Sequence, residues 1–277
     1  MKNNGNFTVC LTHDVDRVKK TYQYITHFIK TQKIYHLKSI FQKTNPYWQF
    51  EKLMRIEEGL GVKSTFFFLN ESIGFNPLNP KNIKLSIGRY DINDEKVKKI
   101  IRKLDGRGWE IGVHGSYNSY KNIELLKKEK HELEKILAHK VHGIRQHYIN
   151  LNPKTWKIQA EAGFRYDSSF GFNNGKIGFM ENKLYPFHPL KNRKNFLVIP
   201  MTIMDWCMMK NNKKKYIELI DIAEKNGGVL TLNWHQRKFN ELEFKNYSKI
   251  YIEIIKECKN RNAFIGTCKD IYNLKWK

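Results

Sequence analysis

The chain has few of the features that mark disulfide-rich, zinc-ribbon or membrane-spanning proteins. Its 277 residues contain only four cysteines, and no two of them have the close spacing of a zinc ribbon or a redox pair. We therefore expect free, buried thiols. No apolar run approaches the roughly 18 residues that a membrane-spanning helix needs. Residues 1–6 are polar and contain no apolar signal core, so these absences predict a cytoplasmic protein.

Proline, glycine and serine do not gather into a linker anywhere in the sequence. The seven prolines and 17 glycines are spread along the chain, and there is no internal repeat. We therefore expect a single domain over residues 1–277. An apolar fraction of 40% is sufficient for the packed core of such a domain.

Acidic residues are also scarce. The sequence has 50 Lys and Arg residues but only 27 Asp and Glu, which gives a formal net charge of +23. This excess indicates either a phosphorylated or membrane-surface partner, or simply a lysine-rich solvated surface, and composition does not decide between them. The charge is spread along the whole chain without a DNA- or RNA-binding motif, so we expect no nucleic-acid partner.

Strand-like and helix-like segments alternate along the sequence. Short runs rich in apolar and β-branched residues predict strands at 7–12, 65–69, 109–113, 141–145, 164–166, 196–204, 229–233 and 263–265. Apolar periodicity and capping residues predict helices at 18–42, 51–60, 94–104, 121–138, 153–162, 213–225 and 241–260. This alternation predicts an α/β fold in which helices cover parallel strands, as an open sheet or a barrel.

Polar clusters follow five of the predicted strands, where the working residues of a parallel α/β barrel lie. They are Thr12–Asp16, His114–Tyr120, Arg145–Tyr148, Asp205–Trp206 and Asn233–His235. Four of them have an ordinary alternative: Asp16 can cap a helix, His114 can lie in a capping loop, Arg145 can form a surface ion pair, and His235 can be a satisfied residue of the rim. Together they supply metal-binding groups, a free carboxylate, an orienting arginine and a second histidine. That set suits metal-assisted hydrolysis of an amide or ester.

The order of these clusters resembles the polysaccharide deacetylases of carbohydrate esterase family four, from Leu11 to about Lys269. The resemblance implies an irregular (β/α)7-type barrel. It also implies a metal-dependent hydrolase that removes an N-acyl group, such as acetyl, from an amino sugar. Thr12–Asp16 is similar to the Asp-x-Asp form of the family's first motif, which implies that Asp14 is the general base and Asp16 a metal ligand.

The remaining clusters resemble the other family motifs. By this resemblance Arg145 positions the base, His235 is the general acid, and Asp205 tunes that acid. His114 matches the first histidine of the family's His-Ser/Thr-x-x-His motif. The metal that this motif binds is most often zinc, so the resemblance implies a divalent metal, with Zn²⁺ the expected ion.

One expected ligand departs from the family pattern. Asn118 stands where the motif has its second histidine, and an amide oxygen is a poorer zinc ligand than an imidazole. Three alternatives remain open. Asn118 binds the metal weakly, His147 supplies the missing nitrogen, or the chain has lost its metal and is a non-catalytic glycan-binding relic.

The expected substrate is a carbohydrate. A cytoplasmic enzyme would meet nucleotide- or lipid-linked sugars, so we expect an intermediate of surface polysaccharide biosynthesis, whose phosphates suit a basic chain. Tyr148, Phe187 and Trp206 are the aromatic residues expected to stack on sugar rings. The segment 19–43 interleaves lysines with apolar residues. This indicates either peripheral contact with the anionic inner membrane face or an ordinary helix packed on the barrel.

Overall fold

A parallel sheet forms the centre of the computed structural model, which describes residues 5–212, 214–274 and 276. Its described strands are β1 Thr8–Val15, β2 Thr65–Leu69, β3 Glu110–Gly115, β4 Gly143–Gln146, β5 Tyr166–Asp167, β6 Leu197–Val198, β7 Ile203–Met204, β8 Val229–Asn233 and β9 Phe264–Gly266. They run in the order β6-β5-β4-β3-β2-β1-β8-β7. β9 pairs with the first half of β1, and β2 pairs with its second half. The predicted parallel α/β fold is confirmed.

The sheet curls until the chain itself joins its two edges. β6 and β7 lie at opposite ends of the strand order, yet only residues 199–202 separate them in sequence. The Cα atoms of Val198 and Ile203 can therefore be at most about 18 Å apart. In this connection the Met201 N–H donates to Phe170 O, and the Thr202 N–H donates to Thr231 O. The result is an irregular barrel, as predicted, that is closed by a connecting segment.

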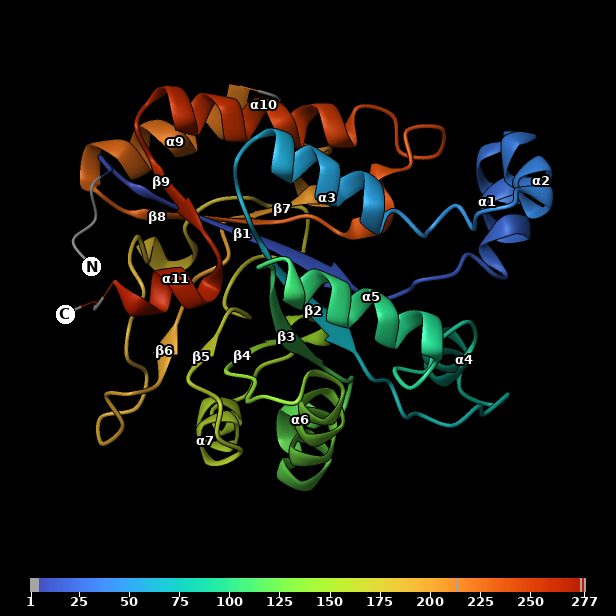
Figure 1. Cartoon of the computed structure of the whole chain (residues 1–277), viewed down its shortest axis with the longest axis horizontal. Coiled ribbons are helices and arrows are strands. Elements are labelled where there is room, and N and C mark those ends of the chain that lie inside the picture. Colours follow the sequence, from blue (N-terminus) through green and yellow to red (C-terminus); the bar gives the residue numbers. More distant parts are fainter. Residues whose placement is uncertain (1–4, 213, 275, 277) are drawn as a thin grey trace.

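Helices cover the outside of the sheet (Figure 1). The described α-helices are α1 Gln23–Thr31, α2 Tyr35–Lys38, α3 Phe50–Gly59, α4 Pro80–Ser86, α5 Glu95–Gly106, α6 Ile123–Leu137, α7 Thr155–Glu161, α8 Asp205–Met208, α9 Lys214–Asn226, α10 Tyr247–Asn260 and α11 Cys268–Asn273. Short 3-10 helices are η1 Ser39–Phe41, η2 Ser119–Lys121, η3 His147–Ile149, η4 Met180–Asn182 and η5 Gln236–Phe239. None of the helices in these ranges is long and apolar enough to cross a bilayer.

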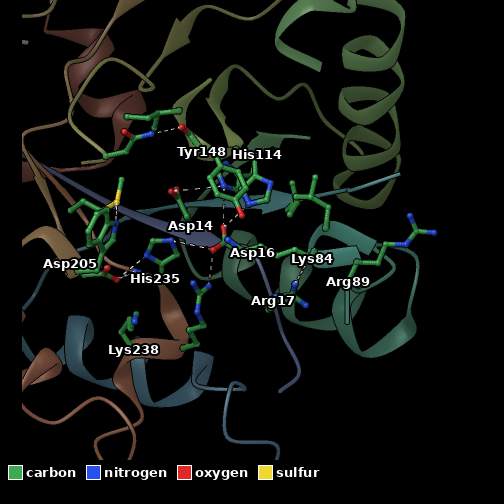
Figure 2. A pocket seen from close by; sticks show the side chains of 18 of the residues that line it. Asp14, Asp16, Arg17, Lys84, Arg89, His114, Tyr148, Asp205, His235 and Lys238 are labelled. Carbon is green, nitrogen blue, oxygen red and sulfur yellow. Dashed lines mark hydrogen bonds and ion pairs between the residues drawn. The ribbon is translucent and has the colours of Figure 1, made fainter. Parts of the chain in front are cut away.

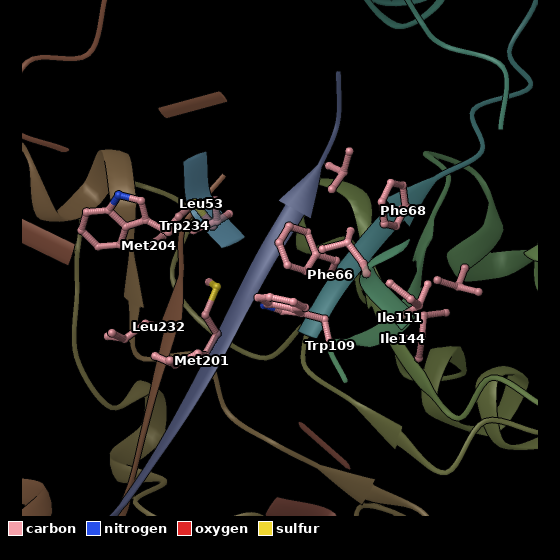
Figure 3. Packing of buried hydrophobic residues seen from close by; sticks show 14 of the residues in the cluster. Leu53, Phe66, Phe68, Trp109, Ile111, Ile144, Met201, Met204, Leu232 and Trp234 are labelled. Atoms are coloured by element: carbon pink, nitrogen blue, oxygen red, sulfur yellow. The ribbon is translucent and has the colours of Figure 1, made fainter. Parts of the chain in front are cut away.

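Two apolar clusters flank the strands because alternate side chains of a strand point to opposite faces. Val9 and Leu11 of β1 belong to the larger cluster. Figure 3 shows other members of this cluster, among them Phe66 and Trp234, on the two sides of β1. Cys10 belongs to the smaller cluster, together with Phe67 and residues of α11. The Cys268 N–H of α11 also donates to Thr65 Oγ1 at 2.8 Å. Since Cys10 and Thr65 lie at strand starts, α11 closes that end and leaves the opposite end for a site.

The long helix expected over residues 18–42 is wrong. The chain is irregular from Asp16 to Tyr22, α1 begins at Gln23, and α1 ends at Thr31, because the next residue, Gln32, has a left-handed φ of 57°. Lys20 is buried, and its Nζ donates to Glu243 Oε2 at 2.6 Å. An ion pair, and not the apolar face of a helix, therefore attaches this part of the chain to the barrel. The helices α4 and α11 were not expected, and the expected helix start at Lys213 lies outside the described residues.

Candidate active site

A cavity of about 430 Å³ opens at the end of the barrel where the strands finish. All five polar clusters contribute to it: its lining includes Asp14, Asp16, His114, His147, Tyr148, Asp205, Trp206 and His235. Figure 2 shows Asp14, Asp16, His114 and His235 grouped in the middle of this cavity. The expectation that the strand-end clusters converge is therefore met for these residues.

Asp14 is a buried carboxylate with one partner on each oxygen. Its Oδ1 accepts from Arg145 NH1 at 3.0 Å, and its Oδ2 accepts from Asn233 Nδ2 at 2.7 Å. Burial alone would raise the pKa of Asp14, but the Arg145 guanidinium, followed by His114 and His235, lowers it below its ordinary value. The side chain is therefore ionised at neutral pH and can accept a proton.

Arg145 is completely buried, which excludes the surface ion pair considered from the sequence. It donates from Nε to Ser168 O at 2.7 Å and from NH2 to Ser168 Oγ at 2.8 Å. Its NH1 also donates to Thr12 Oγ1 at 2.7 Å. These bonds fix the guanidinium plane, so the position of Asp14 is fixed in turn.

Asp16 does not cap a helix, because the next described helix begins at Gln23. It lies instead with His114 and His147 in a group whose possible ligand atoms are all within 4.8 Å of one another. Asp16 Oδ1 is 3.2 Å from His114 Nε2 and 3.9 Å from His147 Nε2. Two imidazole nitrogens and one carboxylate are a donor set that zinc accepts while keeping a fourth position open.

Neighbouring groups orient these three side chains. His114 Nδ1 is 2.8 Å from Arg145 O, which leaves Nε2 directed at Asp16. Arg237 NH1 donates to Asp16 Oδ2 at 2.9 Å. Nδ1 of His147 is 3.9 Å from Glu71 Oε2, and it is a buried nitrogen without a hydrogen-bond partner among the described residues. A carboxylate beside the distal nitrogen of a histidine is the usual surrounding of a metal ligand.

His235 and Asp205 form a second pair on the cavity wall. His235 Nδ1 is 2.9 Å from Asp205 Oδ2, and the His235 backbone N–H donates to the same oxygen at 2.8 Å. Burial alone would lower the pKa of His235, but the carboxylates of Asp205 and then Asp16 raise it to about 9. The imidazole is therefore protonated at neutral pH, and its Nε2 lies 3.3 Å from Asp16 Oδ2.

Three expected site residues do not line the cavity. Arg145 lies behind Asp14 and reaches the cavity only through that carboxylate, and the other two are Asn118 and Phe187. Asn118 precedes η2, where its backbone carbonyl accepts from Lys121 N. Phe187 packs in an aromatic cluster, with its ring centre 5.8 Å from that of Trp156 and 5.6 Å from that of Phe170. Asn118 and Phe187 were expected in the cavity because of their order in the sequence. That order does not specify the path of the backbone, which places both residues outside the cavity lining.

The other two expected aromatic residues do line the cavity. Tyr148 is 41% exposed, and its φ of 58° is a strained conformation for a bulky residue. Its ring centre lies 4.5 Å from that of His147. Trp206 donates from Nε1 to Met204 Sδ at 2.7 Å. Two aromatic faces therefore stand beside the polar centre, where a sugar ring can stack.

Several residues of the site were not assigned a role from the sequence. Glu71 lies beside His147, Arg237 donates to Asp16, and Asn233 donates to Asp14. Arg237 and Asn233 lie within two residues of His235, so proximity to that motif was an available signal. Glu71 follows β2 and has no such signal. Basic side chains complete the lining: Arg17, Lys84, Arg89 and Lys238.

No known protein-family profile matches the chain, and no curated protein matches its sequence. Solved structures do match over nearly its whole length. A protein from Mycobacterium smegmatis assigned to the polysaccharide deacetylases has a TM-score of 0.63 at 15% identity, covering 99% of this chain and 91% of that one. One from Pseudomonas aeruginosa PAO1 in the same class has a TM-score of 0.63 at 14% identity, covering 98% and 91%.

A third similar structure is a pseudoenzyme of carbohydrate esterase family four from Bacillus anthracis. Its TM-score is 0.51 at 11% identity, and the match covers 99% of this chain and 68% of that one. At such identities the likeness concerns the fold. The chain has the fold of the polysaccharide deacetylases, which confirms at that level the resemblance inferred from its motifs.

Proposed function

We propose that this chain is a metal-dependent N-deacetylase of carbohydrate esterase family four that acts on an amino sugar. The observation that supports this most is that Asp14, bonded to Arg145, and His235, bonded to Asp205, line one cavity. These neighbours lower the pKa of Asp14 and raise that of His235, which favours a base and an acid at the same pH. Hydrolysis of an amide needs a base for water and an acid for the departing amine, and both must be in the correct state at the same pH.

Asp16, His114 and His147 would hold the metal, for which Zn²⁺ suits the donor set. A bound divalent ion would polarise the acyl carbonyl and lower the pKa of water. In this assignment His147 replaces the histidine that the family motif has at the position of Asn118. Arg237 positions Asp16 through the bond to Oδ2.

The protein groups divide the proton transfers between them. Asp14 removes the proton from the attacking water, while Arg145 and Asn233 keep its carboxylate aimed at the cavity. His235 gives its proton to the leaving nitrogen, and Asp205 stabilises the imidazolium until then. The two products are the carboxylate of the acyl group, which is acetate when the group is acetyl, and a free amino sugar.

The substrate that fits this cavity carries both a sugar and a negative charge. Tyr148 and Trp206 offer stacking faces. Arg17, Lys84, Arg89 and Lys238 add positive charge to the lining. A nucleotide- or lipid-linked intermediate of polysaccharide synthesis, met in the cytoplasm, carries phosphates that would use these groups.

A glycan-binding relic is the second candidate. A pseudoenzyme with the same fold is among the similar structures, and Asn118 departs from the family motif. The relic would bind carbohydrate through the same aromatic residues, but it would take up no zinc at the Asp16 cluster and release no acetate.

The test is acetate release from N-acetylglucosamine oligomers by the zinc-loaded protein. Asp14→Asn keeps the shape and a hydrogen-bond acceptor for Arg145, but it cannot accept the proton, so we expect kcat to fall at least ~100-fold. Asp91→Asn, at an exposed site, is the matched control and should retain full activity. Equal acetate release by Asp14→Asn and the unaltered chain would remove Asp14 from the role of base.

A further inference from the structure

The segment 25–41 exposes its apolar side chains. Ile25, Ile29 and Ile34 are 59%, 63% and 61% exposed, and Phe41 is 89% exposed. Ile25 and Ile29 are four residues apart on α1 and therefore share a face. Figure 1 shows α1 and α2 projecting beyond the rest of the molecule. A surface helix of a globular domain normally turns such a face inward.

The inward contacts of this segment, and of Lys20 just before it, are polar. Glu243 accepts from Lys20 Nζ at 2.6 Å, and its Oε1 is 2.7 Å from His27 Nδ1. Lys20 Nζ is also 2.8 Å from His36 Nδ1. Charged and aromatic groups therefore attach α1 and α2 to the barrel, while the isoleucines face outward. This inversion of the usual amphipathic pattern indicates that an apolar environment outside the protein covers the outer face of α1.

A second exposed segment follows β2. Phe75 is 61% exposed and Leu78 is 92% exposed. Arg17, which precedes the first segment in the chain, binds the second: its NH1 donates to Ile87 O at 2.7 Å and its NH2 donates to Lys84 O at 2.8 Å. We name the exposed apolar residues of 25–41 and 75–87 the projecting surface.

The two stretches of chain that carry the projecting surface have charged residues of one sign, and the acid that contacts the first of them, Glu243, is buried on its inner side in ion pairs. Residues 17–50 contain seven Lys or Arg and no Asp or Glu, and residues 72–90 contain three and none. Apolar side chains bordered by lysines match the interface of an anionic bilayer, where the chains enter the acyl boundary and the ammonium groups meet the phosphates. A second copy of this chain, also at +23, would bring like charges together.

The projecting surface adjoins the mouth of the cavity. Arg17 and Tyr22 precede α1, Lys84 and Leu85 come from the second segment, and Arg89 follows it. All five line the cavity. In Figure 2, Arg17, Lys84 and Arg89 lie on one side of the central carboxylates. A bilayer that covers the projecting surface would therefore lie beside the opening.

We propose that the projecting surface docks this protein onto an anionic phospholipid bilayer, with the cavity mouth beside the headgroups. The docking does not depend on the proposed chemistry. If the proposed deacetylation is correct, the arrangement favours substrates whose sugar is linked to a membrane lipid through phosphate.

The test is co-sedimentation of the full chain with vesicles of equal parts phosphatidylcholine and phosphatidylglycerol at physiological salt. We expect the chain to bind these mixed vesicles, and to bind vesicles of pure phosphatidylcholine at least ~10-fold more weakly. The double variant Ile29→Ser/Phe41→Ser should lose at least ~10-fold in vesicle affinity, because both side chains leave the acyl boundary. Ile222→Ser on α9 is the control: Ile222 is 42% exposed outside the projecting surface, and its loss should leave binding unchanged.

Three results would overturn the proposal: no binding of the unaltered chain, equal binding by the double variant, or self-association that the double variant abolishes without vesicles. Circular dichroism of each variant verifies the fold. Acetate release from water-soluble oligomers should be the same in the double variant and the unaltered chain. Vesicle binding without any acetate release would support the docking while refuting the proposed function.

Discussion

Asp14 and Asp16 are two residues apart, but their carboxylates have different surroundings. Both side chains leave the same side of β1 and its extension, because strand side chains alternate. Asp14 contacts Arg145 and Asn233, whereas Asp16 faces three imidazoles and the Arg237 guanidinium. Arg145 lowers the pKa of Asp14 against the effect of burial, and His235 and Arg237 do the same for Asp16. The division into base and ligand therefore follows from the neighbours of each carboxylate.

Replacement of His147 should remove the metal, whereas replacement of Asn118 should not. His147 Nε2 belongs to the group of ligand atoms, and Asn118 does not line the cavity. We expect His147→Ala to weaken zinc binding by more than the ~10–100-fold typical of losing a supporting residue, and Asn118→Ala to leave zinc binding within about 2-fold. Competition with a chelator, followed by elemental analysis, measures both. The reverse order would restore Asn118 as the ligand.

The residues predictable from the sequence are those that lie in motifs at strand ends. Asp14, Arg145 and His235 belong to this group, since the ends of parallel strands meet at one edge. Glu71 does not, because it approaches His147 only through the path of the segment after β2. The choice between Asn118 and His147 also depended on how each short turn directs its side chain, and residue order carries no information on that.

At the scale of elements, α6 carries a buried acid. Glu129 is 2% exposed; its Oε2 accepts from Ser116 N at 3.1 Å, and its Oε1 has no partner among the described residues. Burial raises the pKa of Glu129 to about 7. The fold therefore favours the protonated acid. Protonated Glu129 therefore contributes to the free energy of unfolding. This contribution is fully present below 4.5, the ordinary pKa that the residue has in the unfolded chain, and it is lost as the pH rises through about 7.

Glu129→Gln should make stability less dependent on pH. The amide cannot ionise and can still accept from Ser116 N. As the pH rises from 5 to 8, the free energy of unfolding of the unaltered chain should therefore fall by about 2 kcal/mol more than that of the variant. Urea unfolding at the two pH values measures this. Glu124→Gln is the control: Glu124 is an exposed residue of the same helix, paired with Lys127, and its loss should change stability by less than ~0.5 kcal/mol. Parallel pH profiles for Glu129→Gln and the unaltered chain would contradict the assignment.

The segment 18–42 illustrates where element prediction from sequence fails. Its apolar residues have helical spacing, and a buried face was the natural interpretation. In the structure the polar residues Lys20 and His36 are buried and Ile25 and Ile29 are exposed. Periodicity identifies a face, but it does not say whether the barrel or another phase covers that face. Elsewhere, as in α5, where Asp94 accepts from Lys96 N and Val97 N, cap and periodicity agree with the structure.

At the scale of the whole molecule, closure of the barrel connects distant parts of the chain. Residues 199–202 join the two sheet edges, and β1 pairs with β2, β8 and β9. Strands from the beginning, middle and end of the sequence are thus hydrogen-bonded in one sheet. Because no strand can detach without breaking these pairings, the arrangement favours unfolding of the barrel as a single cooperative unit.

The four cysteines provide a test of this cooperativity, because each lies on a different element. Cys10 is on β1, Cys207 on α8, Cys258 on α10 and Cys268 on α11, and all four are free and fully buried. We expect no thiol to react with an aromatic disulfide reagent in the native protein, and four to react as urea unfolds it. If the chain is one unit, thiol labelling and the loss of helical circular dichroism should share one midpoint. Reaction of one or two thiols at lower urea would instead reveal a part that opens independently, and peptide mapping would identify which element it contains.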